Sequence, residues 1–476
     1  MDVSVECQGR MNKAFVNCQM EEPAEPSPWE CEAYERYVHL QQLRKMWDAK
    51  WWPGWRNEAV VKPALQALEM SFRFISSILC DSRAYVDKQE WVRRLESLVN
   101  GQLELISMIC EGDKEAPTIQ LAVSSGVLGT GAAQEVWQRP GALPVVSRSS
   151  EESLLPRLAS WKRAEDLVAR VRLAIECHMQ RVPFTLGLGE PNLAGKPILD
   201  YDTVCRPSNV YALKHPSQGN NAEDSTLATA HQILEAWLRV ADALVARIHE
   251  KVAAPMGAND AARDSWTVER IWRLLMDTVN LLLLVDPDDF LRLKQQLGAN
   301  GSGAPAGAYC LRSRALRNVT KGCRDLRHLV PKVVGVDADP KGGPRLQEAV
   351  MSIFHSHGIP RGGGGAGTVH LLQSLQAIEA AVKRFFFSYQ QLVIVVMGSV
   401  EMKGASYRGG TAADALSQIY TDPPYFPSVD GAKTFLGDYW HYTHQNSLSL
   451  DVCGVHSEGS MNRVDSFADA DKIKGA

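Results

Sequence analysis

Apolar residues recur at helical spacing along most of the chain. In one stretch, intervals of three or four residues separate Leu65, Leu68, Phe72, Ile75 and Leu79. This period places the five side chains on one face of an α-helix. Pro63 precedes them, and proline is tolerated in the first turn of a helix because the N–H that it lacks would have no partner there. The pattern therefore predicts one long amphipathic helix with Pro63 in its first turn.

Most of the remaining apolar segments show the same spacing. Asp87 and Glu90 have the separation of a capping box. The apolar stripe of a second helix follows at Trp91, Leu95, Leu98, Leu105 and Ile109. The same test predicts helices within residues 154–179, 227–248, 268–284, 290–297, 311–329, 346–354 and 369–396. Because hardly any segment alternates with the period of two typical of strands, we predict an all-α protein, a bundle of about ten helices.

Breaks in this pattern predict the domain organisation. Residues 111–147, 298–307 and 362–365 are rich in glycine, with alanine or serine in the longer stretches, and are predicted to be mobile loops. The helical pattern is also interrupted within residues 205–225, where a domain boundary is expected. The predicted units are a flexible N-terminus at 1–28, an N-terminal helical domain at 29–205 with the insertion 111–147, a C-terminal helical domain at 206–440, and a disordered tail at 441–476.

Charge and composition exclude several classes of protein. Of the 476 residues, 51 are Lys or Arg and 55 are Asp or Glu, so the formal net charge is -4. No global basic field is therefore present to hold nucleic acid or an anionic membrane. The hydrophobic fraction of 45% is that of a globular protein. The longest aliphatic runs, 281–285 and 392–397, are far shorter than the roughly 18–20 residues that span a bilayer.

The N-terminus and the cysteines indicate a compartment. The first thirty residues contain several acidic side chains and no long apolar run, which argues against a secretory or transit peptide. Ten cysteines are dispersed along the chain without a C-x-x-C pair, so no zinc ribbon or thioredoxin-type couple is expected. Free, buried thiols suit a reducing compartment. We therefore expect a cytoplasmic protein that binds neither nucleic acid nor membranes.

Two clusters are candidate partner-binding sites. Trp47, Trp51, Trp52 and Trp55 surround the break at Pro53-Gly54. They suit core packing or an interface, but rings around a turn cannot all face one core, so at least one is expected to be exposed. Trp51, Trp52 and Trp55 are the candidates.

The second cluster is cationic. Seven residues, most of them three or four apart, place positive charge along one helical face: Arg312, Arg314, Arg317, Lys321, Arg324, Arg327 and His328. Such a face either docks an acidic partner or is solvated. Arg317 and Arg324 are the candidates for partner binding.

Two weaker patterns suggest ligand sites. Residues 187–196 are glycine-rich and end in Lys196, but Gly189 and Gly195 are one residue too far apart for a phosphate-binding loop, and Pro197 occupies the Ser/Thr position. We expect an ordered connection with left-handed glycines instead. His355, His357 and His370 have no carboxylate or thiolate nearby to complete a metal site. The sequence shows no assignable catalytic motif and no metal site.

Several blocks of sequence resemble the plant nematode-resistance-protein-like family (HSPRO). They are CEAYERYVHLQQLRKMW (31–47), KPALQALEMSFRF (62–74), TLGLGEPNLAGKP (185–197), DPDDFLRLKQQL (286–297), GGPRLQEA (342–349), AIEAAVKRFFFSYQQLV (377–393) and PPYFPSVDGAKTFLGDYW (423–440). The resemblance implies a cytoplasmic plant protein of basal defence and stress response, linked to resistance against nematodes and bacteria and to salicylate signalling. It further implies no enzymatic activity and, as partner, the regulatory subunit of an SNF-related energy-sensing kinase complex.

The C-terminal half also resembles the all-helical tryptophan and indoleamine dioxygenases, which bind haem. The residues concerned are Gly342-Gly343, Leu372-Gln373 and Lys383-Arg384-Phe385-Phe386. This resemblance implies an indoleamine dioxygenase-like fold in that half and places Lys383 at the haem-ligand position. Since a protonated amine has no lone pair for iron, no haem and no other cofactor are expected. The alternative function is a haem- or indole-type small-molecule binder, with His355 or His370 in place of the missing ligand.

Overall fold

The computed structural model describes residues 32–83, 87–119, 150–190, 196–213, 222–254, 257–289, 291–292, 313–336, 344–356, 365–397, 406–407, 410–411 and 419–438. The N-terminal helices are α2 (Glu32–Tyr37), α3 (Leu40–Asp48), α4 (Glu58–Cys80), α5 (Lys88–Cys110), α6 (Leu154–Leu158), α7 (Glu165–Met179), α8 (Tyr201–Cys205) and α9 (Pro207–Ala212). The C-terminal helices are α10 (Ala222–Ala253), α11 (Ala258–Asn280), η2 (Leu281–Leu284), α13 (Arg314–Asp325), η3 (Leu326–Leu329), α14 (Val330–Val333), α15 (Pro344–Ser356), α16 (Gly365–Met397) and α19 (Pro427–Thr434).

The all-α prediction is confirmed. Strands within the described residues are limited to two antiparallel pairs of two residues each, β1 (Thr118–Ile119) with β2 (Ile198–Leu199), and β3 (Ser406–Tyr407) with β4 (Gly410–Thr411). Thr118 pairs with Leu199, so the start of the predicted insertion 111–147 is held against the connection before α8. The rest of that insertion, the loop 298–307, most of the loop 362–365, and the termini 1–28 and 441–476 lie outside the described residues.

Some predicted helix boundaries were wrong. Pro63 lies in the second turn of α4, because the helix already begins at Glu58, where the Asn57 carbonyl accepts the N–H groups of Val60 and Val61. The segment 154–179 forms two helices, since the N–H and the hydroxyl of Ser160 both bind the Arg157 carbonyl and end α6.

Two cysteines depart from the expected burial. Cys80 and Cys177 are exposed, whereas Cys110, Cys205 and Cys323 are buried and free. Cys80 is the last residue of α4, and Cys177 lies two residues before the end of α7, so both thiols are near helix ends.

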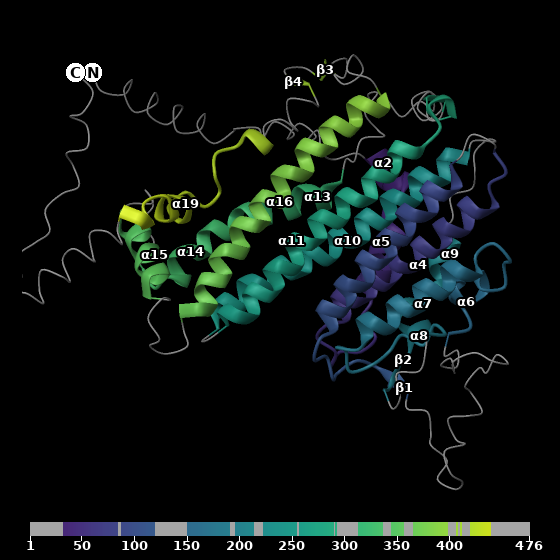
Figure 1. Ribbon diagram of the computed structural model, residues 1–476, viewed down its shortest axis with the longest axis horizontal. Helices are drawn as coiled ribbons and strands as arrows, with labels where there is room; N and C mark the ends of the chain where they lie inside the picture. The colour runs from purple at the N-terminus through teal and green to yellow at the C-terminus, as the bar shows by residue number, and fades with distance from the viewer. Residues whose placement is uncertain are drawn as a thin grey trace, which may run out of the picture.

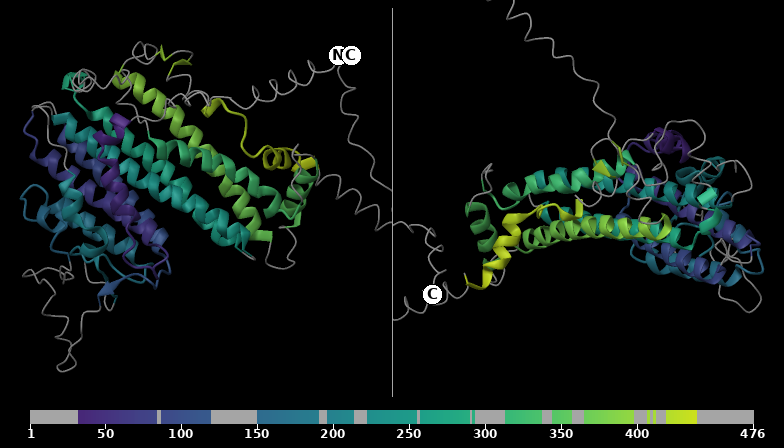
Figure 2. Two further views of the ribbon diagram at one scale, coloured as in Figure 1. Left: turned by 180° about the vertical axis from the view of Figure 1, so that it is seen from behind. Right: turned by 90° about the horizontal axis from the view of Figure 1, so that it is seen from above.

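The long helices lie side by side and form an elongated bundle. Figure 1 shows α4, α5, α10, α11 and α16 with their axes roughly aligned, and α15 and α19 at one end. In Figure 2 the purple and blue N-terminal helices gather toward the other end of the longer green helices. One continuous hydrophobic cluster includes residues from both sides of the expected boundary at 205–206.

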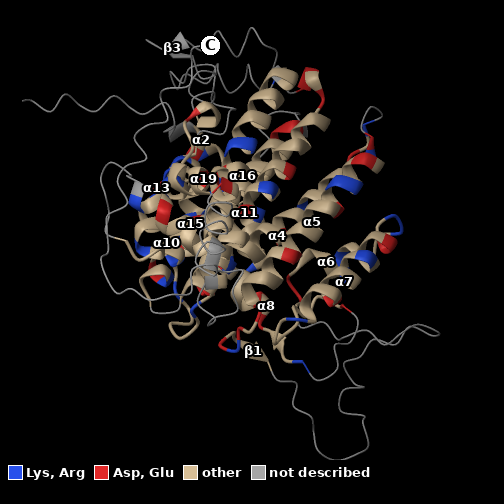
Figure 3. Ribbon diagram, turned by 60° about the vertical axis from the view of Figure 1, so that its left-hand side comes forward, with Lys and Arg blue, Asp and Glu red and all other residues tan. Residues whose placement is uncertain are grey.

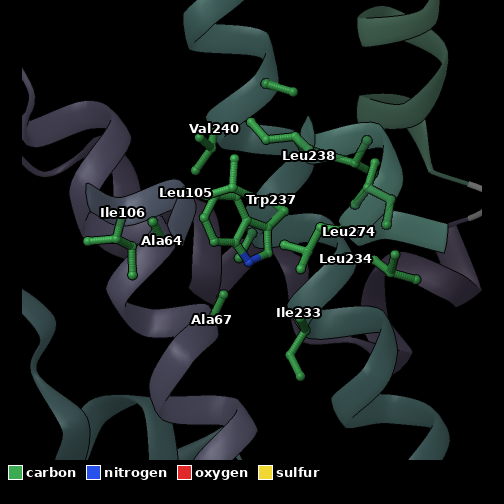
Figure 4. Packing of buried hydrophobic residues seen from close by; sticks show 14 of the residues in the cluster. Ala64, Ala67, Leu105, Ile106, Ile233, Leu234, Trp237, Leu238, Val240 and Leu274 are labelled. Atoms are coloured by element: carbon green, nitrogen blue, oxygen red, sulfur yellow. The ribbon is translucent and has the colours of Figure 1, made fainter. Parts of the chain in front are cut away.

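Helix α10 occupies the centre of the bundle and packs against α4, α11 and α13. Trp237 is fully buried on it, and Figure 4 shows its indole between Ala64 and Ala67 on one side and Leu274 on another. The indole N–H donates to Gln102 Oε1 at 3.1 Å, and Gln102 Nε2 donates to Ser71 Oγ at 2.7 Å. This chain of hydrogen bonds joins α10, α5 and α4 and gives partners to the buried Trp237 indole and Gln102 amide.

A second polar contact lies where α10 meets α2. The Tyr34 hydroxyl donates to Glu235 Oε1 at 2.9 Å, and the Ser313 side chain also binds Glu235. Burial raises the pKa of Glu235 to about 7, and the pKa of the neighbouring His231 is lowered to about 4 by the same cause. Both shifts favour the neutral form, as expected for groups removed from water.

We predict that the free energy of unfolding of Glu235→Gln increases relative to that of the wild type as the pH rises. The raised pKa of Glu235 means that its stabilising contribution is present below the unfolded value of 4.5 and is lost as the pH rises through about 7. Glutamine keeps an oxygen for Tyr34 but never ionises. The difference in free energy of unfolding between the variant and the wild type should therefore increase from pH 5 to pH 8, measured by urea denaturation.

Comparing the two proteins at each pH cancels the groups that they share. These include His231 and Glu69, whose pKa burial also raises to about 7. A difference that stays constant over this range would contradict the prediction.

Candidate functional site

The tryptophan cluster is divided between core and surface. Trp47, near the end of α3, is buried, and its indole N–H donates to Gln66 Oε1 at 2.9 Å. Trp55 is also buried and donates to Asp113 Oδ2 at 2.7 Å. Trp52 packs edge-to-face on Trp55 at a centroid distance of 6.1 Å. These three rings attach the connection between α3 and α4 to the bundle.

Trp51 points away from this core. Its side chain is 45% exposed, so the prediction that at least one ring remains exposed is confirmed. Glu58 Oε1 accepts its backbone N–H at 2.7 Å, which holds the turn in place. The guanidinium of Arg206 lies 3.6 Å from the centroid of the Trp51 ring, a cation–π contact. We call these two residues the Trp51–Arg206 pair.

Sequence reasoning missed Arg206. It stands between α8 and α9 with a left-handed backbone, at φ 52°. The only signal in the sequence was the break before Pro207, because proline disfavours helical geometry in the residue before it. That signal indicates a bend but not which ring the guanidinium would cover.

Arg317 and Arg324 lie in a different part of the molecule, on α13. This helix buries Leu316, Val319 and Cys323, and a Cβ on Gly322 would lie 3.1 Å from Val245 of α10. Because α13 lies so close to α10, its basic face is turned outward. Arg206, the partner of Trp51, directly follows α8, and Figure 1 shows α8 well separated from α13. The structure therefore does not bring the tryptophan cluster and the basic helix face together.

The basic face of α13 lines a pocket of about 320 Å³, which we call the cationic pocket. Figure 3 marks the lysines and arginines of α13 in blue. The lining residues are Arg317, Thr320, Lys321 and Arg324 from α13, Phe386 from α16, and Ile419, Asp422 and Tyr425 from the segment that precedes α19. Residues 419–426 of this segment are called the strap below. Its contribution to the pocket was not predicted.

Lys383 holds the strap against α16. Its ammonium donates to the Asp422 carbonyl at 2.9 Å and lies 2.8 Å from Glu379 Oε1. It is also 5.1 Å from the centroid of the Tyr425 ring. The residue expected at a haem-ligand position is therefore engaged in hydrogen bonds and an ion pair with its own chain.

The glycine-rich connection after α7 is ordered, as predicted, in its described part. Gly187 and Gly189 have φ values of 71° and 87°, in the left-handed region. The buried carboxylate of Glu190 accepts the N–H groups of Gly187 and Leu188, each at 2.6 Å. Lys196 donates to three backbone carbonyls at and just after the end of α7. The amides and the lysine that a phosphate would require are thus used within the chain, and residues 191–195 lie outside the described residues.

The described part of the chain contains no group of three or more His, Cys, Asp or Glu side chains placed to share a metal ion. His370 is exposed on α16, His357 is outside the described residues, and the His355 side chain is not described. Among the described helices, none combines the length and apolar character that crossing a membrane requires.

Comparison with known proteins gives matches along nearly the whole chain. Residues 2–176 match the family model of the Hs1pro-1 N-terminus, and residues 179–442 match that of the Hs1pro-1 protein C-terminus. The nematode resistance protein-like HSPRO2 of Arabidopsis thaliana is 42% identical over 419 residues, which is 87% of this chain and 89% of the relative. HSPRO1 of the same plant is 40% identical over 414 residues, 86% of this chain and 90% of the relative. No solved structure matches.

Because Trp55 is in the core and Trp51 is at the surface, substitutions at the two positions should differ in their effect on stability. Trp55→Ala should lower the free energy of unfolding by about 3–5 kcal/mol, because it leaves a core cavity and removes the partner of Asp113. Trp51→Ala should change it by less than about 1 kcal/mol, since an exposed cation–π contact is weak. Urea denaturation of both variants tests this. Similar losses in the two would contradict the assignment of Trp51 to the surface.

Proposed function

This chain belongs to the Hs1pro-1 family, and we propose that it acts in plant defence as a non-enzymatic protein that works by binding a protein partner. Support for the defence role comes from the two Arabidopsis relatives, both of which are named nematode resistance protein-like. The finer proposal is a cytoplasmic, salicylate-linked role in basal resistance to nematodes and bacteria. The proposed partner is the regulatory subunit of an SNF-related energy-sensing kinase complex.

The Trp51–Arg206 pair is the observation that carries this proposal. Tryptophan and arginine are the residue types most enriched among the side chains that dominate binding energy. Here a large ring is held at the surface by a turn whose other indoles are anchored, and a guanidinium lies directly over it. Because the backbone of Trp51 is already fixed by Glu58, little conformational entropy would be lost when a partner covers the ring.

A non-enzymatic role is supported by the contacts of Lys383. Its ammonium donates to the Asp422 carbonyl and pairs with Glu379. A lysine that acted as an iron ligand would have to lose its proton and break both contacts, of which the one to Asp422 also holds the strap. We therefore propose that the protein has no haem cofactor and no dioxygenase activity.

We predict that Trp51→Ala weakens binding of the kinase regulatory subunit about 30-fold. This corresponds to about 2 kcal/mol, the usual loss at a residue that dominates an interface. Titration calorimetry with the purified subunit measures the change in affinity. The melting temperature should stay close to that of the wild type, because the ring is not part of the core.

Trp266→Ala is the matched control. Trp266 is also a partly exposed tryptophan, at 36%, but it lies on α11. Its replacement should leave the affinity unchanged. Equal loss of affinity in both variants, or wild-type affinity in Trp51→Ala, would show that the pair is not the docking site.

Recombinant protein purified from cells supplied with a haem precursor should show no Soret band. We expect this because Lys383, at the haem-ligand position, donates a hydrogen bond to the strap and has no lone pair for iron while protonated. Absorption spectroscopy of the purified protein, with added hemin as a second condition, measures this. A stoichiometric Soret band that is lost in His370→Ala would favour the haem-binding alternative.

A further inference from the structure

The start of α2 lies where α10 and α13 meet. The Tyr34 hydroxyl donates to Glu235 Oε1 of α10, and the side chain of Ser313, which precedes α13, binds the same carboxyl group. Glu35 Oε1 lies 3.9 Å from Nε of Arg314, the first residue of α13. Because residue 31 is bonded to α2, the chain that leads into this helix arrives beside the first turn of α13.

The basic face of α13 begins at this point and leads to the cationic pocket. Arg317, Lys321 and Arg324 follow one another at intervals of four and three residues, and all three line the pocket. Lys321 is exposed and has no hydrogen bond or ion pair with a described residue.

Arg324 has a donor that no described residue uses. Its Nε is buried without a hydrogen-bond partner among the described residues, and its Nη1 lies 3.8 Å from Asp422, which is a long ion pair. A buried donor without a partner is costly. A carboxylate that reached the pocket would therefore be stabilised there.

The chain before α2 supplies such carboxylates. No lysine or arginine occurs from residue 14 to residue 35. Four glutamates lie within ten residues of this range: Glu21, Glu22, Glu25 and Glu30. We call residues 21–30 the acidic segment. Residues 439–476, at the other end of the chain, carry five acidic and three basic residues, so their charge is mixed. Charge complementarity therefore favours the acidic segment as the occupant of the basic face.

The acidic segment is long enough to cover this face. Ten residues of α-helix rise about 15 Å, which is the distance along α13 from Arg314 to Arg324. An extended chain spans about 3.3 Å per residue, so residues 21–31 can extend over roughly 35 Å. Since α2 fixes the end of this chain beside Arg314, the effective concentration of its glutamates at the pocket is high.

We propose that the acidic segment of this same chain lies along α13 and occupies the cationic pocket. Its carboxylates pair with Lys321 and Arg324, and arginine offers a planar fork of donors that fits a carboxylate. Trp29, which also belongs to the segment, rests on the apolar side of the pocket, where Phe386 and Tyr425 are buried. The contact is made within one chain and does not depend on the proposed kinase partner.

Zero-length cross-linking of the full-length protein tests the proposal. A carbodiimide joins a carboxylate to a lysine amine only when the two groups are in contact. We expect mass spectrometry to find Lys321 joined to at least one glutamate of the acidic segment in the monomer. High salt should lower the yield, because it screens exposed ion pairs. Lys162, which is also exposed but lies between α6 and α7, should show no such link.

Three results of this experiment would overturn the proposal. Lys321 joined to no residue of the acidic segment would mean that the segment lies elsewhere. Lys321 joined only to residues 439–476 would make the other end of the chain the occupant. A link found only in cross-linked dimers would show that the segment of a second copy covers the face.

Proteolysis measures the same contact without chemical modification. A glutamate-specific protease should cleave the acidic segment about fivefold faster in Lys321→Gln/Arg324→Gln than in the wild type, because cleavage requires the undocked segment and two ion pairs are lost. Lys162→Gln/Arg163→Gln is the matched control. It removes the same two charges from the exposed turn between α6 and α7, which Figure 1 shows well apart from α13. Equal rates in all three proteins would contradict the proposal.

Lys321→Gln alone keeps the test decisive even if Arg324→Gln unfolds the protein. Since Lys321 is exposed and has no described partner, its replacement should leave the melting temperature at the wild-type value. Cleavage of the acidic segment should still be about twofold faster, as expected for the loss of one exposed ion pair. A wild-type cleavage rate in this variant, together with a wild-type melting temperature, would also overturn the proposal.

Discussion

The structure depends on the burial of one long helix, α10, on several sides at once. Because α4, α11 and α13 all pack against it, polar side chains along its length are removed from water. Each of them is costly unless it finds a partner. The Trp237 indole donates a hydrogen bond to Gln102. Gln232 accepts one from Arg73, and Glu235 accepts one from Tyr34. These pairs specify which helices can lie beside α10 and in what register.

The cationic pocket follows from the same packing. Since α13 turns its apolar residues and Gly322 toward α10, its arginines and lysine must face outward. The strap, which follows α16 in the sequence, covers part of that face and is held by the hydrogen bond from Lys383 to the Asp422 carbonyl. A charged helix face that would otherwise be solvated becomes one wall of a cavity whose other wall is apolar.

The surface at Trp51 has a different origin. Trp47 and Trp55 anchor the two ends of the connection between α3 and α4, and the Glu58 carboxylate binds the backbone of the turn between them. The turn therefore has little freedom, and Trp51 is presented to solvent in a defined position. Arg206 reaches the ring from the junction of α8 and α9. The two candidate sites are thus built by separate parts of the fold and can be tested separately.

The sequence by itself determined the all-α class, most of the long helices, the family, and the presence of an exposed indole. Each of these depends on a local period or on residues that are neighbours in the chain, as with the spacing of Arg317, Lys321 and Arg324. Only the tertiary structure decided that Arg206 covers Trp51, 155 positions away in the sequence, and that the strap covers α13 and binds Lys383. Contacts between distant segments depend on how whole helices pack, and a helical period specifies which face is buried but not which segment buries it.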